Sequence, residues 1–150
     1  MQLSKRWTGD DGSASLEFIT VGMILLVPLV YLVLTMAAIQ AGALAVEGAA
    51  RQAARVFVQS GTIAAAESSA ERAVQFALAD YGLSPDQAQV AVTCSPNPSL
   101  CLTRRGFVTV SVSVVVPLPL VPPVLDLDVP LGVTLESSAT QQVSRFWGAG

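Results

Sequence analysis

Glu17 is the carboxylate that directly precedes the longest uncharged stretch of the sequence, residues 18–46. A charge at the edge of an apolar helix is costly in lipid unless a cation neutralises it. Cleavage of the peptide bond between Gly12 and Ser13 would create an α-ammonium four residues before Glu17, and residues four apart share a helix face. These residues therefore suit a chain that is cut and then uses Glu17 to neutralise its own or a neighbour's ammonium. The simpler alternative is that Glu17 only marks the membrane boundary.

A second pair of reactive residues is Cys94 and Cys101, which enclose the segment SPNPSL. In an oxidising compartment we expect the pair to close into a disulfide. Closing so short a loop stabilises a domain by roughly 2–3 kcal/mol. In a cytoplasmic domain both residues would instead remain thiols, and the sequence leaves that alternative open.

The remaining composition argues against most other chemistry. The chain has no histidine, so imidazole is excluded both as a general base and as a metal ligand. Two cysteines are too few for a thiolate metal cage, and Asp126 with Asp128 does not supply the six or more oxygens that Ca²⁺ needs. The net charge of −3 comes without a run of Lys or Arg, which argues against nucleic-acid binding. We expect a protein that is not an enzyme, with no cofactor, no metal and no small-molecule substrate.

The element that must position Glu17 is a long helix. Charged residues make up only 13% of the chain, about half the usual fraction. A helix over the apolar run 18–39 would rise about 33 Å, which matches the roughly 30 Å thickness of the hydrocarbon layer. The run is too long for a secretory signal peptide, although removal of the whole segment remains an alternative. Helical spacing continues beyond the run, so we predict one helix over residues 14–59, with Pro28 tolerated inside the membrane.

The rest of the chain predicts a small α+β domain. A second helix is expected within residues 64–82, with Thr62 as its N-cap. Its core-facing residues would be Ala70, Val74, Ala77, Leu78 and Tyr81. Alternating apolar and polar residues predict strands over 89–94, 107–116 and 132–143 that form an antiparallel sheet. Between the last two strands lies an apolar, proline-rich loop, 117–130, which either covers the sheet or contacts a partner or the membrane. Finally, three glycines would allow close helix approach: Gly22, Gly42 and Gly48.

The stretch GSASLEFITVGMILLVPLVYLVL resembles the N-terminus of class III prepilins in the type IV pilin superfamily. More closely, it is similar to the TadE-like pseudopilins of tight-adherence (Tad/Flp) pilus systems. The segment AVEGAARQAARV resembles the Ala/Arg-rich segment that follows the membrane helix in those proteins. The resemblance covers the chain up to residue 58, and VTLESSATQQV matches the closing strand of the family only loosely. Asp10 and Asp11 depart from the pattern, because relatives often carry basic residues there.

This resemblance implies a pilin-like fold and a role for each residue of the junction. Gly12 would precede the scissile bond, and Ser13 would be the new N-terminus. Glu17 would be the recognition and assembly carboxylate, with Phe18 as the aromatic residue beside it. The chain would then divide into a leader, 1–12, a transmembrane and projecting helix, 13–60, and a small extracytoplasmic α+β domain, 61–150.

The resemblance also implies a function and a location. The protein would be a minor pilin, pseudopilin or assembly factor of a Tad-type pilus or secretion system, cut by a prepilin peptidase and assembled laterally through its N-terminal helix. Its partners would be membrane lipid, the prepilin peptidase, other pilin-like subunits and the Tad secretion machinery. It would cross the cytoplasmic (inner) membrane once, with a cytoplasmic N-terminus, and either enter the pilus or stay at its base. The alternative is a membrane-anchored extracytoplasmic binding module without processing or polymerisation.

Overall fold

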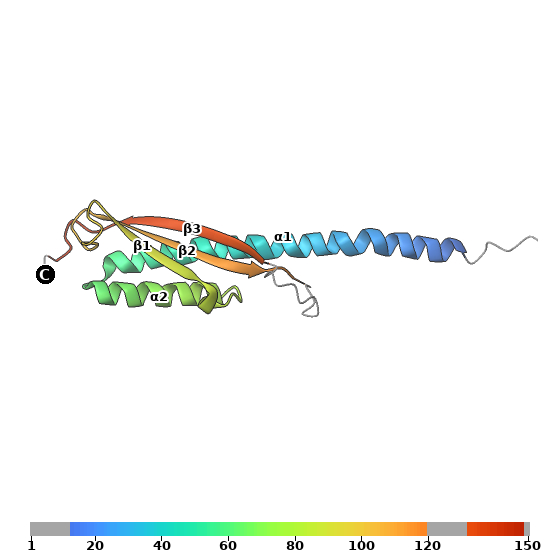
Figure 1. Cartoon of the computed structure of the whole chain (residues 1–150), viewed down its shortest axis with the longest axis horizontal. Helices are drawn as coiled ribbons and strands as arrows, with labels where there is room; N and C mark the ends of the chain where they lie inside the picture. Colours follow the sequence, from blue (N-terminus) through green and yellow to red (C-terminus); the bar gives the residue numbers. More distant parts are fainter. Residues whose placement is uncertain (1–12, 120–131, 149–150) are drawn as a thin grey trace, which may run out of the picture.

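A long helix forms the axis of the molecule in the computed structural model, which describes residues 13–119 and 132–148 (Figure 1). This helix, α1, spans Ser13–Gln59 and contains 47 residues, so it is about 70 Å long. It continues through Pro28, as the sequence predicts for a helix that lies in lipid. Its N-terminal half extends alone, and its C-terminal half packs against the rest of the chain (Figure 1).

The second helix, α2, spans Ile63–Ala79 and runs back beside α1 after a short break (Figure 1). Thr62 is its N-cap, as predicted, and its Oγ1 accepts a hydrogen bond of 3.2 Å from the backbone N–H of Ala65. Gly82 follows the helix with a positive φ of 69°, a conformation that glycine adopts without strain. A short 3₁₀ helix, η1, at Pro85–Gln87 then leads into the sheet.

Three antiparallel strands cover the same half of α1. They are β1 at Gln89–Ser95, β2 at Phe107–Pro117 and β3 at Gly132–Gln142, in the spatial order β1-β2-β3. β2 is the central strand, and its alternating valines are buried while the residues between them are more exposed. The register places Val112 between Val90 of β1 and Ser137 of β3. The predicted fold class, α+β with a long helix, a short helix and a three-stranded antiparallel sheet, is confirmed.

The core lies where α1 meets both α2 and the sheet. The side of α1 that enters the core is rich in alanine, and such small side chains allow close packing of neighbouring elements. Phe57 and Leu78 are the largest of the fully buried side chains. The core residues of α1 are Ala45, Val46, Ala49, Ala50, Ala53, Ala54 and Phe57. The folded module therefore consists of the C-terminal half of α1 together with α2 and the sheet.

Tyr81 corrects the predicted core of α2. Ala70, Val74 and Leu78 are buried and Ala77 packs at the edge of the core, but Tyr81 is 50% exposed. The helix ends at Ala79, so Tyr81 lies in the following turn, where the helical spacing no longer applies. Most of the proline-rich loop 117–130, including Asp126 and Asp128, lies outside the described residues.

Candidate functional site: the exposed half of the long helix

The N-terminal half of α1 presents apolar side chains in all directions. Every residue from 15 to 34 is exposed. Among the residues that the structure describes, one helix is long and apolar enough to cross a membrane, and it lies near the N-terminus. The exposed stretch is about 30 Å long, which matches the hydrocarbon thickness. This half of α1 fits a single-pass membrane protein, and the domain begins close to where the exposed stretch ends.

Glu17 lies in the second turn of α1, at the end of this apolar stretch. Its side chain is exposed, and the neighbouring Phe18 is 80% exposed. Ser13 is the first residue of α1 and Glu17 the fifth, so the two are separated by about one helical turn. Gly12, the predicted residue before the cleavage site, lies outside the described residues.

The structure corrects the role that we predicted for Gly42. We predicted that Gly22, Gly42 and Gly48 would admit another helix. A Cβ at Gly42 would instead lie 2.5 Å from Val116 Cγ2 and 3.0 Å from Leu135 Cδ1, so this glycine lets α1 contact the sheet of its own chain. Gly22 and Gly48 have open space around the Cβ position in the described structure. This contact could not be predicted from the helix sequence alone, because Val116 and Leu135 lie on strands far along the chain.

Cys94 and Cys101 form a disulfide with 5.0 Å between their Cα atoms. It joins the C-terminal part of β1 to the loop that leads towards β2. The next residue, Leu102, is buried in the core, so the disulfide and this leucine together attach the loop to the domain. The predicted pairing is therefore present, at the end of the domain that lies farthest from the exposed half of α1 (Figure 1). We call this end the distal end.

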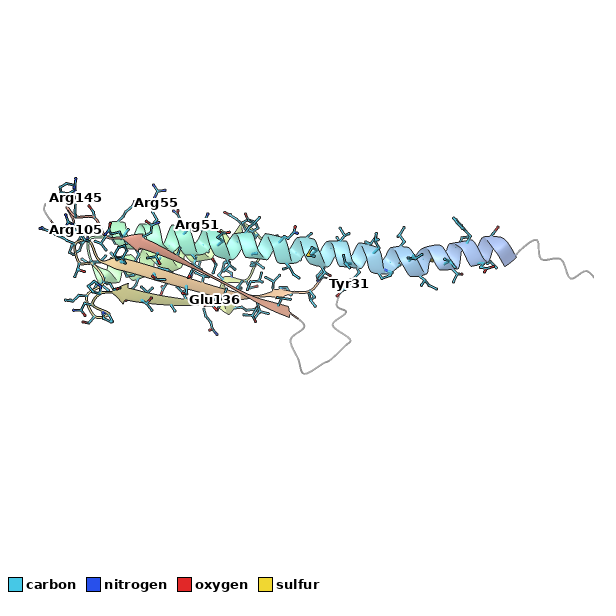
Figure 2. The ribbon with its side chains drawn as sticks, turned by 90° about the horizontal axis from the view of Figure 1, so that it is seen from above. Tyr31, Arg51, Arg55, Arg105, Glu136 and Arg145 are labelled. Atoms are coloured by element: carbon cyan, nitrogen blue, oxygen red, sulfur yellow. A yellow bond between two sulfur atoms is a disulfide. The ribbon has the colours of Figure 1, made fainter. Side chains whose placement is uncertain are left out.

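A shallow polar groove runs between α1 and β3. It has a volume of about 420 Å³ and is lined by Arg51 and Arg55 of α1 and by Ser138, Thr140 and Gln141 of β3. Figure 2 shows Arg51 and Arg55 along the same side of α1. The Arg51 guanidinium forms an ion pair with Glu47, one turn earlier on the helix. The groove was missed because it joins segments that are far apart in the sequence.

The described residues contain no group of three or more His, Cys, Asp or Glu side chains placed to hold a metal ion. Comparison of the chain with protein-family models, with curated proteins and with solved structures finds no match. The exposed half of α1 can anchor the domain in a bilayer, and it can present an apolar surface with one carboxylate near its end to neighbouring helices.

Proposed function

We propose that this protein is a minor pilin-like subunit or assembly factor of a Tad-type pilus or secretion system. In this proposal a prepilin peptidase removes residues 1–12, and the protein then associates laterally with other pilin-like subunits through the exposed half of α1. The observation that carries the proposal is the position of Glu17: an exposed carboxylate near the start of the exposed, otherwise apolar half of α1. A charge at that place needs a cation, and cleavage before Ser13 would supply one.

The lateral mode of association is supported by the burial pattern of α1. Residues 15–34 are exposed over their whole circumference, whereas the C-terminal half of the helix is already occupied by α2 and the sheet. Lipid is as apolar as these side chains, so helix–helix association in the membrane depends on packing and on polar contacts. A Glu17–ammonium contact between neighbouring chains would be such a polar contact.

The disulfide supports an extracytoplasmic domain. Disulfides persist in oxidising compartments and are rare in the cytosol. Cys94 and Cys101 lie at the distal end, so that end would face the oxidising side and the N-terminus would face the cytoplasm. The positive-inside rule alone does not decide the orientation, because Lys5 and Arg6 before the helix are balanced by Arg51 and Arg55 after it.

The first test is the N-terminus of the mature protein. The full chain is co-expressed with a prepilin peptidase, extracted from membranes and analysed by intact-mass spectrometry. We expect a mass that corresponds to a chain beginning at Ser13. A mature protein that retains Met1 in the presence of an active peptidase would contradict the proposal and would favour the membrane-anchored binding module.

The second test separates insertion from assembly. Glu17→Ala removes the carboxylate without changing the apolar helix, so the variant should insert normally and be incorporated into complexes with other pilin-like subunits at least tenfold less, a change equivalent to about 1.4 kcal/mol. Glu67→Ala, which removes an exposed carboxylate from α2, is the matched control and should assemble normally. Quantitative crosslinking in membranes measures both. Equal incorporation of the two variants would exclude the assembly role of Glu17.

A further inference from the structure

Three arginines that are separated in the sequence meet at the distal end. Arg104 and Arg105 lie in the turn before β2, and Arg145 follows β3. Backbone hydrogen bonds hold the two segments together: Arg105 N donates to Val143 O at 3.2 Å, and Val143 N donates to Gly106 O at 2.8 Å. We call Arg104, Arg105 and Arg145 the distal arginine cluster. Figure 2 labels Arg105 and Arg145 at the end of the molecule opposite to the exposed half of α1.

The C-terminal segment is fixed to this end by further contacts. Arg104 Nε donates to the backbone carbonyl of Trp147 at 2.9 Å, and Trp147 Nε1 donates to the carbonyl of Ser60, at the end of α1, at 3.0 Å. The side chains of Arg105 and Arg145 are exposed. Arg104 therefore helps to build the distal end, while Arg105 and Arg145 are available to an external partner.

Carboxylates are scarce around the cluster. The sequence has none in residues 87–119 or 137–148, so the segments that form the sheet's distal end carry positive charge alone. Helix α2 starts at the same end, but its first carboxylate, Glu67, comes only in its second turn. Glu136 of β3 lies farther from this end (Figure 2). The distal end is thus electropositive although the whole chain has a net charge of −3.

Exposed apolar side chains accompany the arginines. Phe146 is 67% exposed and Leu100 is 54% exposed, and the Arg145 guanidinium lies 4.6 Å from the centre of the Phe146 ring. A soluble polyanion would match the charge but would leave these apolar groups in water. Arginine beside exposed aromatic and aliphatic groups is the combination that binds at the interface of an anionic bilayer, where phosphates meet acyl chains.

We propose that the distal end docks on the anionic lipid surface of a second membrane. The membrane that holds residues 15–34 is out of reach, because the cluster lies at the other end of the molecule (Figure 2). Arg105 and Arg145 contact lipid phosphates, and Phe146 enters the headgroup layer. This docking requires neither cleavage after Gly12 nor lateral assembly, so an unprocessed chain should dock equally well, and the fate of the leader does not decide the outcome.

The test uses the full chain in phosphatidylcholine nanodiscs and measures its co-flotation with vesicles. We expect binding to vesicles of equal parts phosphatidylcholine and phosphatidylglycerol, and none to phosphatidylcholine vesicles. Arg105→Gln/Arg145→Gln should weaken binding roughly thirtyfold, and Arg145→Gln alone roughly fivefold. Arg51→Gln/Arg72→Gln changes the net charge equally at other sites and should retain binding. The single variant keeps the test decisive if the double variant does not fold.

Two results would overturn the proposal. Equal loss of binding in the two double variants would show that net charge alone attracts the chain to the vesicles. Capture by immobilised polyphosphate without binding to anionic vesicles would make the cluster a site for a soluble polyanion. Phe146→Ser distinguishes the two modes further: it should reduce vesicle binding severalfold and leave any binding to polyphosphate unchanged.

Discussion

The two glutamates of α1 show how much the meaning of a residue depends on its surroundings. Glu47 lies C-terminal to the exposed half of the helix. It forms an ion pair with Arg51 one turn later, as their spacing predicts. Glu17 lies beside exposed apolar side chains, and the nearest cation that the sequence offers on its helix face would be the ammonium that cleavage before Ser13 would create. The same residue type is thus an ordinary surface charge at Glu47, whereas at Glu17 it would serve recognition and assembly in the function proposed above.

At the same scale, the disulfide leads to a stability prediction. Cys94→Ser/Cys101→Ser should lower the free energy of unfolding by about 2 kcal/mol, because the loop between β1 and β2 gains freedom in the unfolded chain. Denaturant unfolding in detergent measures the change. As a control, reductant should destabilise the natural chain by a similar amount and leave the double variant unaffected. A double variant as stable as the oxidised natural chain would contradict the prediction.

Individual residues were predicted well where local spacing decides their environment. Thr62 caps α2, and Ala70, Val74 and Leu78 are buried, because cap chemistry and helical periodicity are local properties. Tyr81 was misplaced since the helix ends two residues earlier, and end positions are the weakest part of a periodic pattern. Gly42 was assigned to helix–helix contact because its actual neighbours, Val116 and Leu135, lie on strands far along the chain.

The elements themselves follow closely from hydrophobic periodicity. β2 is buried on one face only, so its alternating valines fix its extent and its orientation. The N-terminal half of α1 follows from the uncharged stretch. In lipid, a single segment can form all of its backbone hydrogen bonds only as a helix. The packing of α1 against both α2 and the sheet was beyond prediction, because alanines on a helix do not indicate which element covers them.

The contact between α1 and the sheet gives a paired prediction. Gly42→Ala places a methyl group 2.5 Å from Val116 Cγ2 on a stiff, β-branched side chain, so it should lower the free energy of unfolding by about 1 kcal/mol even after the gain in helix propensity. Gly48→Ala is the matched control: its methyl group meets open space in the described structure, so it should raise stability by up to about 1 kcal/mol. Thermal unfolding followed by circular dichroism compares the two. Shifts of the same sign would contradict the proposed close contact at Gly42.

At the scale of the whole molecule, apolar surface and positive charge lie at opposite ends. The exposed half of α1 occupies one end, and the distal arginine cluster occupies the other (Figure 2). The apolar end is evident from the sequence because it is one continuous stretch. The basic end is not, because Arg145 joins Arg104 and Arg105 only when β3 returns along β2. Charge counts along the chain therefore missed the electropositive surface that folding creates.

This separation predicts that a tryptophan at the distal end cannot reach the bilayer that holds residues 15–34. The chain has two tryptophans, so Trp7→Phe leaves Trp147 as the only one. Trp147 is hydrogen-bonded to Ser60 at the end of α1, roughly 40 Å along the helix from residue 34. The Trp7→Phe chain is reconstituted in dilute phosphatidylcholine vesicles with brominated acyl chains. We expect the fluorescence of Trp147 not to be quenched, because bromine quenches only at short range. In the matched variant Trp7→Phe/Tyr31→Trp/Trp147→Phe, the tryptophan replaces an exposed side chain of the apolar half and should be strongly quenched. Strong quenching of Trp147 in these neutral vesicles would mean that the domain folds back onto its own membrane, and the distal end would then not face away from it.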